Sequence, residues 1–140
     1  MRSFQIFIAV ILLSGTSSLC QAQTENKGKE PSVADTDKIE VYYFHNTRRC
    51  ETCKAVEAVT RKTLEENFAQ QMKAGEITFQ SLNIEDEENE PLARKLHVSG
   101  QTLLFVKDGK KKDLTNEAFM FARSNPDKLK TKIVTAIEKL

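Results

Sequence analysis

The sequence predicts an α/β domain in which a mixed four-stranded sheet is flanked by helices, in the order β-α-β-α-β-β-α. Residues 39–44 (IEVYYF) and 77–84 (ITFQSLNI) have the β-branched and aromatic composition of strands, and a long amphipathic segment separates them. Asp108-Gly109 lies between two further strand-like segments, as in a tight hairpin. Strands joined through a helix can run parallel and strands joined by a hairpin run antiparallel, so the sheet is predicted to be mixed.

The first 22 residues have the three-part layout of a secretory signal peptide. Arg2 precedes a short apolar run at 6–13 (IFIAVILL), and small and polar residues follow at 14–22. This run is shorter than the ~20 residues of a membrane-spanning helix. Cleavage after Ala22 is therefore favoured over a permanent N-terminal anchor. It would remove Cys20 and leave an extracytoplasmic protein, periplasmic or secreted, with two cysteines.

Lipid attachment at Cys20 is the less favoured alternative to its removal. A lipoprotein signal needs a small residue immediately before its cysteine, and Leu19 stands there. Residues 23–37 are polar, with few apolar side chains, so we expect a flexible leader before a folded domain at 38–140.

The first helix is predicted to follow Cys50 and to end at Gly75. From Cys53 onward, five residues share one face at helical spacing: Val56, Thr60, Leu64, Phe68 and Met72. In the second strand, Ile77, Phe79 and Leu82 are the residues predicted to be buried.

The second half of the chain predicts the hairpin and three helices. The acidic run at 85–90 is expected to be a solvated loop, and Pro91 opens a helix that continues through Leu96. Residues 102–106 (TLLFV) predict the third strand, and a fourth lies near 112–114. A short packed helix is expected within 116–123, and the last helix begins with the cap signature Asn125-Pro126-Asp127. Its apolar stripe consists of Leu129, Ile133, Ala136, Ile137 and Leu140.

Composition argues against nucleic acid as a partner. The 21 basic and 20 acidic residues leave a formal net charge of +1, without the concentrated basic face that binds phosphates. The chain has no Trp and few aromatic residues with which to stack on bases.

Cys50 and Cys53 form a Cys-x-x-Cys motif where the first strand hands over to the first helix. A helix N-terminus favours a thiolate, and Arg48 and Arg49 add positive charge, whereas Glu51 opposes it. We therefore expect the pKa of Cys50 to lie below the ordinary ~8.5. Cys50 is predicted to be the nucleophile and Cys53, one turn on and facing the core, the resolving thiol.

Two other interpretations of the pair stay open. Metal sites use the same spacing, and Cys50, Cys53, His45 and His97 form a nominal Cys₂His₂ set, although nothing in the spacing brings His97 to the pair. An inert local disulfide is the third interpretation, but it would close almost no loop. Redox chemistry is favoured, with no metal and no cofactor. Haem attachment is excluded because Lys54 follows the second cysteine.

The sequence resembles the thioredoxin-like superfamily over residues 38–140, and is most similar to its small exported bacterial members. The resemblance rests on residues 41–54, 82–85 (LNIE) and 98–109 (VSGQTLLFVKDG). It implies a thioredoxin-like fold and reversible disulfide exchange with a protein or small-thiol partner, with Cys50 attacking and Cys53 resolving. We expect a monomer, and by family analogy a membrane electron donor. The direction of electron flow stays open.

The chain departs from the family's motif between and before its cysteines, where Glu51-Thr52 replaces Gly-Pro and Arg49 replaces an aromatic residue. Gln101 stands where the family has a cis-proline, in the substrate-positioning loop of Gly100, Gln101 and Thr102. A trans peptide is expected there, because a cis bond before a non-proline residue costs ~3 kcal/mol.

Phe44 occupies the place of a buried acid on the first strand. Proton transfer at Cys53 would then fall to Glu57, His45 or water. These departures keep a second function in play: a non-catalytic thioredoxin-like module that binds a soft metal ion or a protein partner through the same motif.

Overall fold

The computed structural model describes residues 37–140. The predicted signal peptide, Cys20 and the leader up to residue 36 lie outside the described residues.

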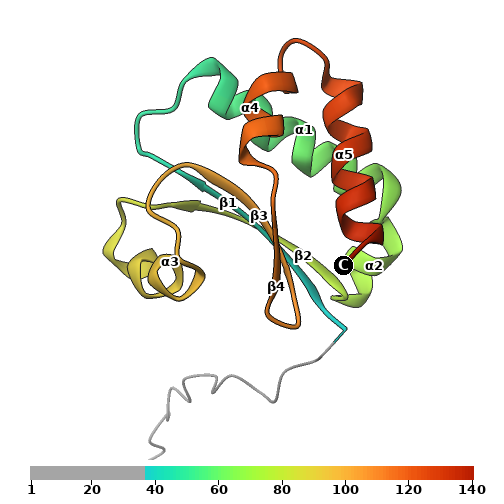
Figure 1. Cartoon of the computed structure of the whole chain (residues 1–140), viewed down its shortest axis with the longest axis horizontal. Coiled ribbons are helices and arrows are strands. Elements are labelled where there is room, and N and C mark those ends of the chain that lie inside the picture. The colour runs from blue at the N-terminus through green and yellow to red at the C-terminus, as the bar shows by residue number, and fades with distance from the viewer. Residues whose placement is uncertain (1–36) are drawn as a thin grey trace, which may run out of the picture. The chain divides into compact units, whose positions relative to one another are not determined.

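A mixed four-stranded sheet in the order β2-β1-β3-β4 forms the centre of the described domain (Figure 1). The strands are β1 (Ile39–His45), β2 (Ile77–Asn83), β3 (Thr102–Lys107) and β4 (Lys110–Asp113). β1 pairs parallel with β2 and antiparallel with β3, and β4 pairs antiparallel with β3. The predicted mixed sheet is confirmed, and it places β2 and β4 at the two edges.

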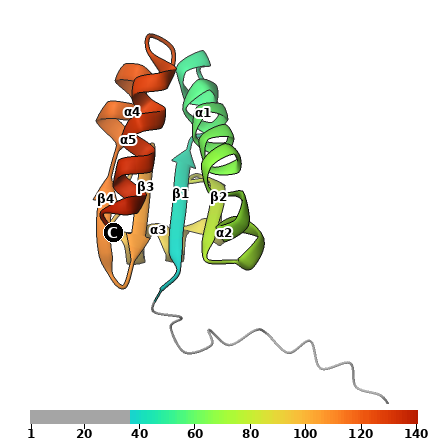
Figure 2. The same cartoon turned by 90° about the vertical axis from the view of Figure 1, so that its right-hand side faces the viewer.

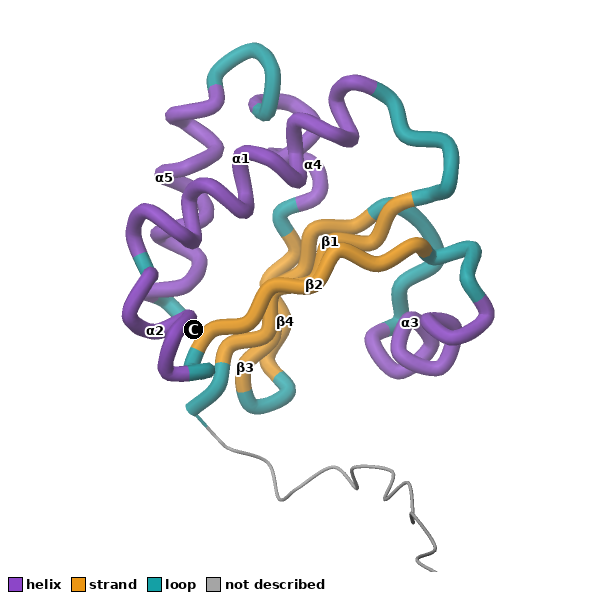
Figure 3. Tube along the Cα trace, turned by 180° about the vertical axis from the view of Figure 1, so that it is seen from behind, coloured by secondary structure: helices purple, strands orange, loops and turns teal. Residues whose placement is uncertain are grey.

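Helices cover both faces of the sheet. One face carries α1 (Glu51–Asn67), α4 (Thr115–Phe121) and α5 (Pro126–Glu138), and the opposite face carries α3 (Glu90–Leu96) (Figure 3). A short helix, α2 (Ala69–Ala74), follows α1, and a single 3₁₀ turn, Glu87–Asn89, precedes α3. No helix within residues 37–140 is long and apolar enough to cross a bilayer.

Alternation along β1 divides the core into two layers. Val41 and Tyr43 face the helices α1 and α5, whereas Tyr42 and Phe44 face α3. All four side chains are buried, which is why residues 41–44 form a continuous apolar run. The edge strand β2 is covered less well: Ile77 is buried, but Phe79 and Leu82, also predicted to be buried, are only partly so. Of the stripe on α5, Leu140 alone is partly exposed.

The single long helix predicted up to Gly75 is wrong, because the helix breaks at Phe68. Phe68 has φ −132° and ψ 26°, and its nearly buried ring packs in the core. The break leaves few groups unpaired: the Phe68 N–H still donates to the Leu64 carbonyl, and the Asn67 side chain donates to the Thr63 carbonyl at 2.7 Å. Asn competes well for backbone groups, which explains why the helix ends there. Gly75, at φ 78°, ends α2 instead.

The hairpin and the last helix form as predicted, with one shift of boundary. Asp108 and Gly109 both have positive φ (51° and 75°), the requirement of a two-residue hairpin turn. β4 begins directly after this turn, at Lys110, two residues before its predicted start. At α5, the Asn125 side chain accepts a hydrogen bond from the Lys128 N–H at 3.1 Å, which confirms the cap.

Candidate functional site

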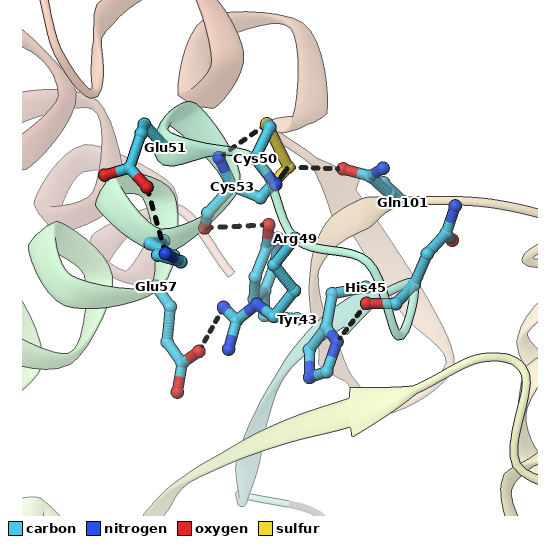
Figure 4. Close-up of a disulfide and its surroundings, with 10 residues drawn as sticks. Tyr43, His45, Arg49, Cys50, Glu51, Cys53, Glu57 and Gln101 are labelled. Atoms are coloured by element: carbon cyan, nitrogen blue, oxygen red, sulfur yellow. Dashed lines mark hydrogen bonds and ion pairs between the residues drawn. A yellow bond between two sulfur atoms is a disulfide. The ribbon is translucent and has the colours of Figure 1, made fainter.

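Cys50 and Cys53 form a disulfide at the N-terminus of α1, with their Cα atoms 5.1 Å apart (Figure 4). Cys50 is the N-cap residue, with extended backbone at φ −76° and ψ 164°. Its sulfur accepts a hydrogen bond from the Cys53 N–H at 3.1 Å, as a Ser or Asp oxygen does in an ordinary cap. The Cys50 N–H points back to the Cys53 sulfur at 3.2 Å. The Cys53 N–H, which belongs to the first turn of α1 and has no acceptor within the helix, therefore points at the sulfur of Cys50.

The two cysteines differ sharply in exposure. Cys53 is only 2% exposed, whereas Cys50 is exposed to solvent. This difference follows from position, since Cys50 lies at the helix start and Cys53 one turn on, against the core. A partner can therefore reach Cys50 but not Cys53, in keeping with the predicted roles of attacking and resolving sulfur.

Tyr43 on β1 fixes the first turn of α1 to the sheet. Its hydroxyl donates a hydrogen bond to the Cys53 carbonyl at 3.0 Å, and its side chain is fully buried (Figure 4). Burial raises the pKa of Tyr43 and outweighs the opposing effect of the nearby Arg49 guanidinium, so the phenol stays neutral and keeps its donor proton. Nothing in the sequence distinguishes Tyr43 from the other aromatic residues of β1.

Arg49, immediately before the motif, is ion-paired with Glu57 on α1 (Figure 4). Its guanidinium carbon lies 5.7 Å from the centre of the Tyr43 ring, and Arg61 pairs with the other oxygen of Glu57 at 2.9 Å. The charge of Arg49 is thus offset by a carboxylate that the sequence analysis did not pair with it. Arg48 is exposed and has no carboxylate partner within residues 37–140.

Glu51 is also neutralised in part. Its carboxylate pairs with the Lys54 ammonium at 2.9 Å, on the exposed side of the first helical turn. The negative charge that opposes a thiolate at Cys50 is therefore weakened, and the backbone N–H groups of α1 remain as the main favourable field at the sulfur.

Glu57→Gln is expected to reduce stability in a pH-dependent way. Burial raises the pKa of Glu57, but hydrogen bonds from Arg49 and Arg61 outweigh it and hold the pKa below its usual range. The ion pair's contribution is therefore present above the unfolded-state pKa of ~4.3 and is lost as the pH falls through the lower folded-state value.

Urea unfolding of the wild type and of the Glu57→Gln variant at pH 7 and pH 3 measures this effect. The variant should lose at most about 1 kcal/mol at pH 7, because the pair is only partly buried, and little at pH 3. An equal loss at both pH values would contradict the ion-pair interpretation.

The loop before β3 brings one predicted residue to the disulfide. The Gln101 Oε1 lies 3.2 Å from the Cys53 sulfur (Figure 4). The Thr102 hydroxyl donates to the Gly100 carbonyl at 3.1 Å, so these two residues shape the loop. Residues 37–140 contain no cis peptide bond, which confirms the expected trans peptide at Gln101.

The histidines and Phe44 lie apart from the sulfur chemistry. His45 packs against Tyr43, with ring centres 5.9 Å apart, and its Nδ1 lies 3.0 Å from the Asn46 carbonyl. His97 is the C-cap of α3, at φ 57°, and Phe44 is fully buried beneath α3. Within the described part of the chain, no three Cys, His, Asp or Glu side chains are grouped as a metal site requires.

No protein-family model and no curated protein sequence matches this chain. Solved structures do. Thioredoxin O2 from Arabidopsis thaliana, in its oxidised state, has a TM-score of 0.50 and 22% identity over 72% of this chain and 76% of its own. A thioredoxin from Malassezia sympodialis has a TM-score of 0.47 and 21% identity over the same shares.

The first of these likenesses shows that residues 37–140 adopt the thioredoxin fold, as the resemblance of the sequence implied. The Cys50–Cys53 disulfide lies at the start of α1, the helix that follows β1. This combination of fold and disulfide supports thiol-disulfide redox chemistry in general.

Proposed function

We propose that this protein exchanges thiols and disulfides with a protein or small-thiol partner, outside the cytoplasm, through Cys50 and Cys53. One observation carries the proposal: an exposed sulfur caps α1 and accepts a helix N–H, and a buried sulfur lies one turn behind it. Nucleophile and resolving group are thereby distinguished by position alone.

Starting from the dithiol, the Cys50 thiolate attacks one sulfur of a partner disulfide. A Cys50–partner disulfide forms, the partner's S–S bond breaks, and the other partner sulfur leaves as a thiolate that takes up a proton. Cys53 then loses its proton and attacks the Cys50 sulfur, which restores the Cys50–Cys53 disulfide and releases the second partner thiol. Two electrons pass to the partner, and the reverse sequence oxidises a partner dithiol.

The surroundings of the sulfurs favour this order. When the disulfide is reduced, the Cys53 N–H and the helix dipole favour negative charge on Cys50. The Cys53 thiol lies beside Gln101 Oε1, which can accept its S–H hydrogen bond but cannot take its proton. Hydrogen bonds from Arg49 and Arg61 hold the pKa of Glu57 below its usual range, which makes its carboxylate a weak proton acceptor. His45 packs against Tyr43 and has no contact with either sulfur among the hydrogen bonds of residues 37–140, so water is the acceptor we propose when Cys53 attacks.

Cys53→Ser is expected to trap the mixed disulfide. Without the resolving thiol, the Cys50–partner bond persists, so incubation with a disulfide-linked peptide should give a covalent adduct at Cys50 that dithiothreitol releases. Peptide mass mapping locates the adduct. The matched Cys50→Ser protein should form none, with Cys20→Ser in both proteins to remove the third thiol, and an adduct formed equally by both variants would overturn the assignment.

Action outside the cytoplasm rests on the layout of the first 22 residues. We expect the exported protein to begin at Gln23, as measured by intact mass and N-terminal sequencing of cell fractions. Placing two arginines in the apolar run, Val10→Arg with Leu12→Arg, should keep the full-length chain in the cytoplasm. A chain that begins at Cys20 with the added mass of lipid would establish anchoring, and an unprocessed wild-type chain in the cytoplasm would contradict export.

A further inference from the structure

A lysine-rich groove of about 790 Å³ runs between β4 and α5, two elements that lie side by side along one edge of the domain (Figure 2). This size falls within the range of binding sites for peptide side chains and small ligands. The sequence predicts β4 as a hairpin strand and α5 as a helix with an apolar stripe, and it predicts no binding site at either. Six of the residues that line the groove are Lys110, Lys111, Lys112, Lys128, Lys132 and Lys139.

The positive charge in this groove is mostly uncompensated. Among residues 37–140, Glu117 is the only acidic side chain that lines it. Of the six lysines, Lys111 extends to the opposite face of the sheet and donates to the Leu96 carbonyl at 2.9 Å, so the groove holds the ammonium groups of the other five. The ammonium group of Lys128 lies 4.2 Å from the centre of the Phe121 ring. None of the six forms an ion pair with a carboxylate of residues 37–140. Because the whole chain carries a net charge of only +1, the groove is a local concentration of cations that an anionic partner would relieve.

The walls of the groove suit an extended chain. Its apolar lining consists of Leu114, Ala136 and Leu140. One wall is β4, an edge strand that has β3 on one side and no other strand of residues 37–140 on its free side. An extended peptide can pair with the free backbone groups of such an edge. The other wall is a stripe of α5 that presents Lys128, Lys132 and Lys139 at helical spacing.

The kind of cation favours carboxylates spread along a peptide over a phosphate group. No arginine of the described part of the chain lines the groove. Arginine is the residue that binds phosphate in a planar two-bonded geometry, whereas lysines act as separate point charges on flexible stems. We propose that this groove docks an extended acidic segment of a partner protein, which adds to the edge of β4 and sets its carboxylates against the lysines. The docking does not require the proposed redox function.

The test uses the full chain and a defined probe, an acetylated, fluorescein-labelled peptide of five Glu-Val repeats, with a Lys-Val peptide as its matched control. Fluorescence anisotropy at low salt should show saturable binding of the acidic peptide only. Affinity should fall severalfold from 20 to 150 mM salt, because the screening length shortens to about 8 Å.

Two charge reversals locate the binding. Lys112→Glu with Lys132→Glu, one residue in each wall, should weaken binding about tenfold or more. The control with the same charge change is Lys73→Glu with Lys95→Glu, at exposed positions outside the groove, and it should bind as the wild type does. The neutral pair Lys112→Gln with Lys132→Gln should show an intermediate loss, and thermal unfolding establishes that all variants are folded.

Two further experiments can overturn the proposal. Methylating alternate backbone nitrogens of the probe removes donors needed at the strand edge, so undiminished binding would contradict strand addition. Groove-dependent binding to phosphatidylglycerol vesicles without binding to the acidic peptide would assign the groove to a membrane surface and overturn a peptide partner. Because the charge-reversed variant keeps Cys50 and Cys53, it should still reduce a small-molecule disulfide, so failure of the docking and failure of the redox proposal are measured separately.

Discussion

Replacing Cys50 with serine is expected to slow the exchange of a partner disulfide by on the order of a thousandfold, the largest loss of activity for any single change in this chain. Cys53 cannot substitute for it. Cys53 is 2% exposed, and its backbone is fixed at the carbonyl by the buried Tyr43 hydroxyl. A partner disulfide therefore cannot approach the remaining sulfur without opening the first turn of α1.

The measurement is the rate at which the reduced protein cleaves a fluorescent disulfide peptide, followed against time. Cys20 is a third thiol of the full chain, so both proteins carry Cys20→Ser. Alkylation by iodoacetamide gives an independent readout, since one fast-reacting thiol should disappear with Cys50 and persist in the Cys53→Ser protein. Equal rates of peptide cleavage with and without Cys50 would show that the exposed sulfur is not the nucleophile.

Local pattern was sufficient to predict most of the fold. The buried composition of β1, the Asp108-Gly109 turn and the Asn125 cap each act over a few residues, so the sequence alone contains the whole signal. The place of the cysteines at the junction of β1 and α1 follows from the same local patterns. The break at Phe68 does not, because helical spacing of apolar residues continues through it, whereas the Asn67 side-chain hydrogen bond and the packing of Phe68 in the core favour the non-helical backbone.

The missed parts of the site are contacts between elements. Tyr43 reaches the Cys53 carbonyl across ten residues of sequence, and Arg49 finds Glu57 eight residues on. In the sequence, Tyr43 resembles an ordinary core aromatic residue and Arg49 resembles an unpaired charge. Gln101 lies 48 residues from Cys53. Only the resemblance of the sequence to the thioredoxin-like superfamily places Gln101 near the cysteine pair, because the spacing of residues along the chain does not relate the two.

The groove between β4 and α5 illustrates the same limit on a larger scale. Lys112 and Lys132 are twenty residues apart, and each belongs to an element whose polar face looks ordinary by itself. Only the edge position of β4 and the packing of α5 beside it bring the two sets of lysines into one cavity. The net charge of the sequence therefore gives no indication of the lysine-rich groove, which becomes apparent only when the lysines are located in the fold.

Gln101→Glu is expected to suppress thiolate formation at the dithiol and so to change the pH dependence of exchange. The substitution puts a carboxylate where an amide oxygen now lies 3.2 Å from the Cys53 sulfur. A negative charge at such a distance disfavours a thiolate and should raise the pKa of the neighbouring thiols by about 1 to 3. The thiolate fraction at pH 7 should fall by at most about 10- to 1000-fold, the limit for a thiol that is mostly protonated at that pH. Because a more basic thiolate is a better nucleophile, the rate at pH 7 should fall less, by about 3- to 30-fold.

The sign of this effect reverses at high pH. Above the pKa of both proteins each dithiol is fully ionised, and the more basic thiolate of the variant should then attack faster than that of the wild type. The rate of iodoacetamide alkylation between pH 5 and pH 10 measures both limbs of this crossover. Gln101→Met, of similar shape but without charge, is the matched control and should leave the profile nearly unshifted. A glutamate variant that is slower by the same factor at every pH would instead indicate that Gln101 acts through the shape of its loop, because only an electrostatic effect on the sulfurs can make the two profiles cross.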